Sequence, residues 1–325
     1  MITHEPLENA VSGKPVALIA GPTASGKSDL AVRLAQQIES SGRRAVVINA
    51  DSAQVYSDLR ILSARPSEDE MGGIEHRLFG SWDGAMACSA PDWAEAAKRE
   101  IDDLHAENAV PILCGGTGLY MRVLLEGIAA IPPIDPAIRE SVRAMPTDMA
   151  YAHLQAEDPQ RAAQLAPADS QRIARALEVV RSTGRSMLDW QADTQGGIAH
   201  RIDLHPLILL PDREWVFDRC DRRFAMMLAE GGVEEVRTLL DRDLDPALPV
   251  MRAIGVPEVA AMLRGELTRE EAIERGRLST RQYAKRQFTW FRNQSPSQWP
   301  RSRNETISLP DLFVSLFQKS VDIRA

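Results

Sequence analysis

The chain has 325 residues, of which 44% are hydrophobic and 26% charged, so it can bury a sizeable core and has the composition of a soluble globular protein. No apolar run has the length of a membrane span, the first fourteen residues lack a signal-peptide pattern, and the three cysteines lack the spacing of a disulfide framework or a zinc site, so we expect a cytoplasmic protein. The net charge of −8 disfavours a nucleic-acid partner unless positive charge is concentrated locally.

A phosphate-binding loop follows the first predicted strand. Residues 16–20 are apolar and partly β-branched, as in a buried strand, and residues 29–35 have apolar side chains at helical spacing. Between them, GPTASGKS matches GxxxxGK[ST] in the strand–turn–helix context that this motif requires. Its backbone N–H groups and Lys27 can hold a diphosphate or polyphosphate, and the Ser28 hydroxyl can hold Mg²⁺. The loop residues are Gly21, Pro22, Thr23, Ala24, Ser25, Gly26, Lys27 and Ser28.

Two further motifs follow predicted strands. Asp51 ends the strand at 45–50 and could assist a Mg²⁺ site, act as a general base or cap a helix, and its local sequence does not choose between these roles. The strand at 109–114 leads into Gly115-Gly116-Thr117-Gly118, which permits close backbone approach or forms an ordinary flexible turn. Because ligands of parallel sheets bind beyond the carboxyl ends of the strands, these motifs predict a site at one sheet edge.

The rest of the chain is predicted as a helical insertion followed by the end of the core. Residues 137 to about 195 are helix-rich, with many Arg and Ala residues and no convincing strand, and a strand pattern returns at 202–210. Later helices are predicted at 213–230, 233–240 and 269–293, with a break over 243–257. We predict an α/β fold of the P-loop NTPase type, a parallel sheet flanked by helices, whose core spans 1–136 and 200–325 around a helical domain at 137–199.

The last predicted helix belongs to a basic segment. From Arg269 to Arg303 there are nine Lys or Arg residues and three acidic ones, against the negative charge of the whole chain. Such a segment can contact a phosphate backbone or form an ordinary solvated helix face. Charge alone does not decide between these two interpretations.

Several strings along the chain together resemble one known family. GPTASGKS, DSAQVY and GGTGLY occur in the order and spacing of the tRNA dimethylallyltransferases, and the chain is similar to the bacterial members. Further matching strings are EHR at 75–77, QRIARALEV at 171–179, MRAIG at 251–255 and RQYAKRQFTWFR at 281–292. The phosphate loop occurs in many nucleotide-binding families, whereas this combination is specific.

The resemblance implies a reaction and the residues that catalyse it. A dimethylallyl group would pass from dimethylallyl diphosphate to N6 of adenosine 37 in tRNA, with the diphosphate and Mg²⁺ in the phosphate loop. Asp51 would be the general base that accepts the N6 proton, and Arg223 would bind the diphosphate, although it could also be a helix-surface charge. Thr117 and Arg139 match positions beside the target nucleotide. His76 matches a family histidine near the site, but a core or loop role is equally compatible.

The resemblance also implies a tRNA interface that includes the helix from Lys285 to Arg292. The target adenosine would be flipped out of the anticodon loop, and the insertion would grip the stem through its phosphates. The implied tRNA-binding residues are Asp51, Ser52, Ala53, Gln54, Arg139, Gln171, Arg172, Ile173, Ala174, Arg175, Arg252, Ala253, Ile254, Gly255, Lys285, Arg286 and Arg292. Val256 departs from the family pattern, because bacterial members commonly carry Tyr there.

Three other functions remain open from the residues themselves. The phosphate loop also suits a small-molecule kinase or an adenylate isopentenyltransferase that acts on free AMP. The insertion and the basic helix count against both, since neither small substrate needs them. A non-catalytic nucleic-acid-binding module would keep the basic residues without needing Asp51. We expect a monomeric enzyme with Mg²⁺ as its cofactor.

Overall fold

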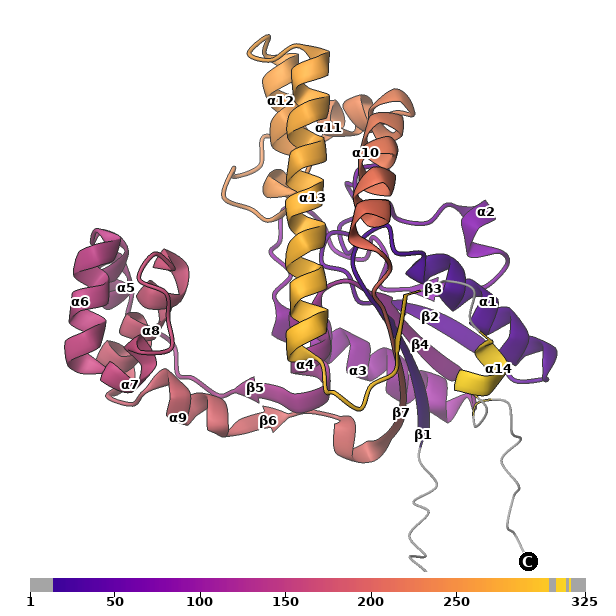
Figure 1. Ribbon diagram of the computed structural model, residues 1–325, viewed down its shortest axis with the longest axis horizontal. Helices are drawn as coiled ribbons and strands as arrows, with labels where there is room; N and C mark the ends of the chain where they lie inside the picture. The colour runs from indigo at the N-terminus through magenta and orange to yellow at the C-terminus, as the bar shows by residue number, and fades with distance from the viewer. Residues whose placement is uncertain (1–13, 304–307, 314–315, 317–325) are drawn as a thin grey trace, which may run out of the picture. The chain divides into compact units, whose positions relative to one another are not determined.

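The computed structural model describes residues 14–303, 308–313 and 316, which form two compact units. The first unit, which comprises the described residues up to 124 and from 199 onward, contains a parallel β-sheet (Figure 1). The strand order is β3-β2-β4-β1-β7-β8, and each of these pairings is parallel. The strands are β1 (Lys14–Ala20), β2 (Ala45–Asn49), β3 (Glu75–Arg77), β4 (Val110–Gly115), β7 (Ile202–Leu209) and β8 (Arg301–Ser302). The predicted fold class is confirmed, whereas the first thirteen residues and the predicted core limit at 325 lie outside the described residues.

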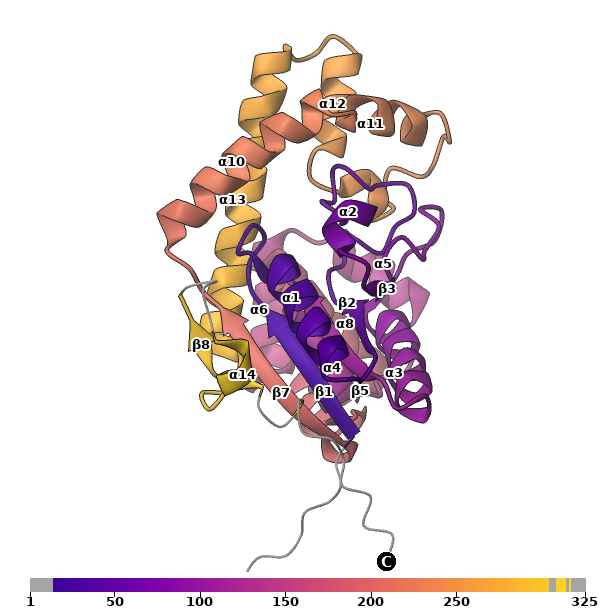
Figure 2. The ribbon, with the colours of Figure 1, turned by 90° about the vertical axis from the view of Figure 1, so that its right-hand side faces the viewer.

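Helices cover both faces of this sheet. The chain runs from β1 to β2 through α1 (Lys27–Ser40), and in the opposite direction from β3 to β4 through α3 (Ala90–Ala106). Right-handed crossovers in opposite directions place these two helices on opposite faces, and Figure 2 shows α1 in front of the sheet. All residues of β2 and β4 are buried, which explains why their sequences are continuous apolar runs rather than alternating ones.

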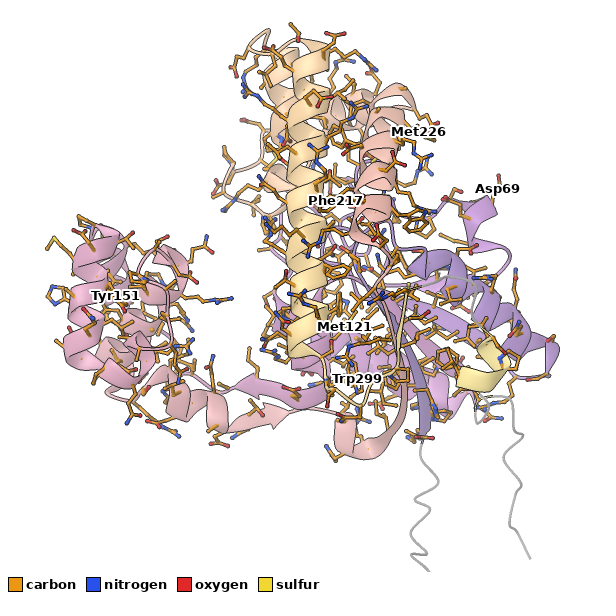
Figure 3. All side chains as sticks on the ribbon, viewed as in Figure 1. Asp69, Met121, Tyr151, Phe217, Met226 and Trp299 are labelled. Atoms are coloured by element: carbon orange, nitrogen blue, oxygen red, sulfur yellow. The ribbon has the colours of Figure 1, made fainter. Side chains whose placement is uncertain are left out.

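The C-terminal helices stand against the edge of the sheet where the predicted motifs lie. α10 (Arg213–Ala229) and α13 (Arg269–Gln294) pack side by side, and Phe217 of α10, labelled in Figure 3, packs against a buried cluster that both helices share. The predicted break over 243–257 is wrong in part, because α12 begins at Val256. The remaining elements of this unit are α2 (Glu68–Met71), α4 (Gly118–Glu126), η1 (Ala199–Arg201), α11 (Gly232–Leu240), η2 (Val250–Arg252), α12 (Val256–Leu263) and α14 (Leu309–Leu312).

Residues 125–198 form a second compact unit with its own core. Its buried centre includes Leu154, Ile173 and Leu177. The helices are α5 (Pro136–Arg143), α6 (Thr147–Glu157), α7 (Pro159–Ala162), α8 (Ser170–Thr183) and α9 (Met187–Ala192), and β5 (Gly127–Ala129) pairs antiparallel with β6 (Thr194–Gly196). The expectation of no strand from 137 to about 195 is therefore wrong only at its end, where β6 begins, a strand of three exposed residues without an apolar pattern. None of the described helices has the length and apolar character to cross a membrane.

Candidate active site

The phosphate loop connects β1 to α1, as the motif predicts. Its backbone passes through the left-handed region at Ala24, with φ +61°, and at Gly26, with φ +88°. This conformation is unfavourable for alanine, so the surrounding packing must hold it. The Ala24 methyl group is buried in a cluster with Val216 and Cys220 of α10 and Ala284 of α13. Two helices that are distant in sequence therefore fix the shape of the loop.

Two largely desolvated cations lie at this loop. Lys27 is 9% exposed, and its Nζ donates a hydrogen bond to the Pro22 carbonyl at 3.3 Å. Burial lowers the pKa of Lys27, and the nearby Asp51 carboxylate opposes that shift. The Arg223 guanidinium, on α10, donates to the Thr23 hydroxyl, and burial also lowers the pKa of Arg223. Cations that have lost hydration water bind a multivalent anion strongly, because the anion restores their pairing.

Asp51 is held rigidly just beyond β2 and is 6% exposed. Its Oδ1 accepts a hydrogen bond from the Ala53 N–H at 3.1 Å, and its own N–H donates to Asn49 Oδ1 at 2.8 Å. Asn49 is itself fully buried and donates to the Asp51 carbonyl at 3.1 Å. No helix starts at this point, so the helix-cap interpretation is wrong. The carboxylate is instead fixed in a turn at the strand end.

The turn after β4 is tied to the turn after β2. Thr117 Oγ1 accepts from the Ser52 N–H at 2.9 Å and donates to Ser52 Oγ at 3.1 Å. The phenol of Tyr283, on α13, hydrogen-bonds with the same two side chains, and burial raises the pKa of Tyr283, with a further contribution from the Asp51 carboxylate. The predicted convergence of Asp51 and Thr117 at one sheet edge is thus observed, and a tyrosine that was not predicted joins them.

Two cavities meet at Asp51. A cavity of about 710 Å³ opens over the phosphate loop, and its cationic side chains are Lys27, Arg60, Arg65, Arg219 and Arg223. A second cavity of about 310 Å³ has a more apolar wall, formed in part by Tyr56, Phe224, Met227, Ile254 and Tyr283. Five residues line both cavities and so mark where they meet: Thr23, Asp51, Ser63, Arg223 and Met227. The Asp51 carboxylate therefore lies where a cavity with several cationic side chains joins a more apolar one.

Most predicted tRNA-binding residues of the first unit lie around these cavities. The smaller cavity is lined by Ser52, Ala53, Arg252, Ala253, Ile254 and Arg286, and Gln54 lines the larger one. Gly255 is buried beside this group. Lys285 and Arg292 are exposed, but they lie on another side of α13 from Arg286, since successive helical residues are rotated by about 100°. The predicted basic helix therefore presents its charges in two directions.

The other predicted tRNA-binding residues belong to the second unit. Arg139 is exposed on α5, and Gln171 and Arg172 are exposed on α8. Arg175 is partly exposed and lies 3.6 Å from Glu178. Ile173 is fully buried in the core of this unit, and Ala174 packs against the same core. The Ile173 side chain therefore serves packing rather than RNA contact, and the interface predicted for its exposed neighbours stays a prediction.

His76 and the side chains that could bind a metal ion also line the larger cavity. His76 Nδ1 lies 2.9 Å from the Ile74 carbonyl, and burial lowers the pKa of this imidazole. Within the described residues, no group of three or more His, Cys, Asp or Glu side chains could hold a metal ion. The Ser28 hydroxyl and the Asp51 carboxylate, the two groups that the motifs suggest for a metal ion, both line the cavity, as do the carboxylates of Asp29, Glu70 and Glu230. A metal ion here would need most of its ligands from a bound substrate and water.

Sequence reasoning missed Tyr283 and Gln287. Both belong to the string RQYAKRQFTWFR, from which only the basic residues were assigned functions. Thr280, Ala284, Gln287 and Phe291 are all buried and recur every three or four residues along α13. This periodicity could have identified Gln287 as a residue on the inner face. Val256, the departure noted above, is 1% exposed at the start of α12.

Comparison with known proteins connects this site to one family. Residues 54–294 match the sequence model of the IPP transferase family. The tRNA dimethylallyltransferase of Erythrobacter litoralis is 64% identical over 304 residues, which cover 94% of this chain and 96% of that protein. The corresponding protein of Novosphingobium aromaticivorans is 62% identical over 260 residues, covering 80% of this chain and 92% of its own length.

Solved structures agree with the sequence comparison. The full-length tRNA isopentenylpyrophosphate transferase of Bacillus halodurans has a TM-score of 0.66 at 29% identity, over 93% of this chain and 94% of that one. A eukaryotic dimethylallyltransferase acting on tRNA has a TM-score of 0.71 at 30% identity, over 85% of this chain and 69% of that one. The chain therefore belongs to the IPP transferase family.

Proposed function

We propose that the protein transfers a dimethylallyl group from dimethylallyl diphosphate to N6 of adenosine 37 in tRNA and releases diphosphate. The observation that carries this proposal is the junction of two chemically different cavities at Asp51. Two substrates that enter from the two cavities would meet at a carboxylate positioned to remove a proton. The names of the relatives, which are tRNA dimethylallyltransferases, support the same reaction.

The larger cavity suits the diphosphate end of the donor. Lys27, Arg219 and Arg223 line it together with the phosphate loop, whose N–H groups and helix N-terminus favour an anion. As the allylic C–O bond breaks, negative charge develops on the leaving diphosphate. Cations that are already fixed and partly desolvated stabilise this charge without reorganisation. The dimethylallyl carbon that is released would then face Asp51 and the smaller cavity.

Magnesium fits this site as an ion carried mainly by the diphosphate. Ser28 and Asp51 offer one hydroxyl and one carboxylate, and Mg²⁺ commonly takes one or two protein oxygens with waters and substrate phosphates. When bound, the ion would supply charge neutralisation on the leaving group. Lys27 and Arg223 are the protein side chains that would hold the diphosphate without the metal ion.

The smaller cavity suits a flipped nucleobase. Tyr56, Phe224 and Tyr283 provide aromatic and apolar walls against which a base can stack, whereas Arg252 and Arg286 provide positive charge for the adjacent phosphates. A base that sits in a loop must leave the stack to reach a buried carboxylate. These walls favour an acceptor with a flat, apolar ring face over a small polar acceptor.

Asp51 would complete the transfer. The adenosine N6 nitrogen forms a bond to the allylic carbon, the electron pair of the breaking C–O bond stays on diphosphate, and Asp51 accepts the proton that N6 loses. Asp51 Oδ1 already accepts from the Ala53 N–H, so Oδ2 is the oxygen available for this proton. The Thr117–Ser52 pair and Tyr283 fix the neighbouring backbone. We place this activity in the cytoplasm, consistent with three unpaired cysteines among the described residues.

One experiment separates this proposal from its alternatives. The protein is incubated with dimethylallyl diphosphate and an unmodified anticodon stem-loop, and prenylation at N6 is followed by mass spectrometry. AMP replaces the stem-loop in one control, and ATP replaces the prenyl donor in another. We expect transfer to the stem-loop alone. Transfer to AMP would support an adenylate isopentenyltransferase, consumption of ATP would support a kinase, and RNA binding without transfer would support a binding module.

A further inference from the structure

The side chain of Gln287 connects the two halves of the candidate site. Gln287 is 5% exposed, on the inner face of α13, and lies within the helix that the resemblance assigned to tRNA binding. Its Oε1 accepts a hydrogen bond from the Thr23 N–H at 2.8 Å, and its Nε2 donates to the Gly116 carbonyl at 2.9 Å. One amide therefore bridges the phosphate loop and the turn that carries Thr117, across 171 and 264 residues of sequence.

On the phosphate-loop side, this amide acts through Thr23. The Thr23 N–H donates to Gln287, so it is not one of the loop N–H groups left to hold an anion. The Thr23 hydroxyl accepts a hydrogen bond from Arg223, the cation that lines both cavities. Holding the Thr23 backbone therefore also fixes where the Arg223 guanidinium stands. This chain of contacts runs from α13 through the loop to α10.

On the side of the turn after β4, the amide of Gln287 occupies the space that a side chain at residue 116 would need. A Cβ atom on Gly116 would lie 2.2 Å from Gln287 Nε2 and 3.1 Å from Asp51 Oδ2. The glycine thus allows the amide and the carboxylate to approach the same point of the backbone. Two residues later, a Cβ atom on Gly118 would lie 2.2 Å from the Trp290 ring, so α13 rests directly on this turn.

We propose that Gln287 is a positioning residue that sets the distance between the diphosphate site and Asp51. It does not contact either substrate. Its acceptor oxygen holds the phosphate loop and, through Thr23, Arg223. Its donor nitrogen holds the turn beside Asp51. One side chain therefore positions both the diphosphate site and the carboxylate. A misplacement of reacting atoms by about 1 Å can lower the rate by about a hundredfold. The inference rests on the proposed dimethylallyl transfer.

The test uses two substitutions that remove the bridge in different ways. Gln287→Met keeps the size and neutrality of the side chain but loses both hydrogen bonds. We expect its single-turnover rate to fall by roughly ten- to a hundredfold, its affinity for dimethylallyl diphosphate to weaken, and its stem-loop affinity to stay near that of the parent. Rates are divided by the folded fraction, which circular dichroism measures. Gln282→Met, on the exposed side of the same helix, is the matched control.

Gln287→Glu gives a pH readout that a purely structural role would not produce. A protonated carboxylic acid accepts from Thr23 and donates to Gly116 as the amide does, whereas the ionised form lacks the donor. The titratable side chains on the elements around it include Lys27, Asp51, Cys114, Arg219, Cys220, Arg223, Tyr283 and Arg286. Burial of the new carboxyl favours its neutral form. We expect the rate of this variant, relative to the parent, to rise as the pH is lowered from 8 to 6.

The outcomes separate this inference from the proposed function. A parent protein that transfers no dimethylallyl group would refute the function itself. An active parent with a Gln287→Met variant of unchanged rate and donor affinity would refute only the positioning role. If the methionine variant does not fold, a pH-independent rate ratio for Gln287→Glu leads to the same rejection. Low activity of Gln287→Glu beside full activity of Gln287→Met would assign the loss to charge repulsion and would also reject the proposal.

Discussion

The two cavities that meet at Asp51 are built from different kinds of sequence. The larger one depends on the phosphate loop, a continuous motif whose geometry follows from a strand, a turn and a helix. The smaller one combines the segment after β2 with α10, residues 249–254 and α13, which approach only in the folded chain. A local motif therefore identifies the cavity that we propose for the diphosphate, whereas the cavity that we propose for the acceptor depends on tertiary packing. Variants at each cavity test whether this division also holds for function.

The largest effect is expected where the two cavities join. Asp51→Asn keeps the shape of the side chain but cannot accept the N6 proton, so turnover should fall by roughly 10²–10⁴-fold. Binding of dimethylallyl diphosphate and of the stem-loop should change little. Single-turnover kinetics with both substrates bound measures the chemical step, and Asp69→Asn, an exposed aspartate on α2, is the control. A normal single-turnover rate would remove Asp51 from the chemistry.

Lys27→Ala should affect the larger cavity alone. Losing a buried cation that faces the diphosphate is expected to weaken donor affinity by about ten- to a hundredfold. Stem-loop affinity should stay near that of the parent, because the smaller cavity is unchanged. Isothermal titration with each substrate separates the two effects, and Lys98→Ala, whose lysine pairs with Glu95 on α3, is the control. Equal losses for both substrates would contradict the division between the cavities.

The smaller cavity is tested through the salt dependence of RNA binding. Arg286 lines this cavity, whereas Lys285 is exposed on another side of α13. If each contacts a phosphate, each alanine variant should lower the slope of log affinity against log salt by about 1. Arg33→Ala, on α1 beside Asp29, should leave the slope unchanged. A reduced slope for Arg286→Ala alone would confine the RNA to the cavity side of the helix.

The smallest expected effect concerns His76 in the larger cavity. Burial lowers the pKa of His76 in the free protein, so the imidazole is neutral at pH 7. On acidification, a bound diphosphate favours protonation of this imidazole, and the added positive charge strengthens binding. The ratio of donor affinities between the parent and His76→Gln should therefore be constant at higher pH and rise severalfold toward pH 5.5. A constant ratio throughout would place His76 outside the electrostatics of the site.

Much of the α/β core could be predicted because its signals are local. The apolar runs before the phosphate loop, Asp51 and Thr117 are strands, and the site lies at their carboxyl ends. The strands β3, β5, β6 and β8 were not predicted, because two or three residues carry no usable pattern. Their pairing is decided by the neighbouring chain, which no local window contains.

The role of the glycines after β4 could not be predicted from the sequence. Gly116 and Gly118 were compatible with a flexible turn or with close approach. The structure decides for close approach, because Gln287 and Trp290 occupy the space that their side chains would need. The partners are more than 170 residues away, as the 171-residue separation of Gly116 and Gln287 illustrates. Only an assembled fold could identify them.

The position of α13 also has a consequence for biosynthesis. A ribosome produces the phosphate loop early, and domains fold from the N-terminus as they emerge. The Thr23 N–H donates to Gln287, and Ala24 packs against Ala284 of the same helix, so both contacts come from near the end of the chain. The nascent chain therefore carries a complete phosphate-binding motif for most of its synthesis without the contacts that shape it. Activity appears late, when the last long helix docks, so an interrupted translation product would retain the signature of the enzyme but not its catalytic geometry.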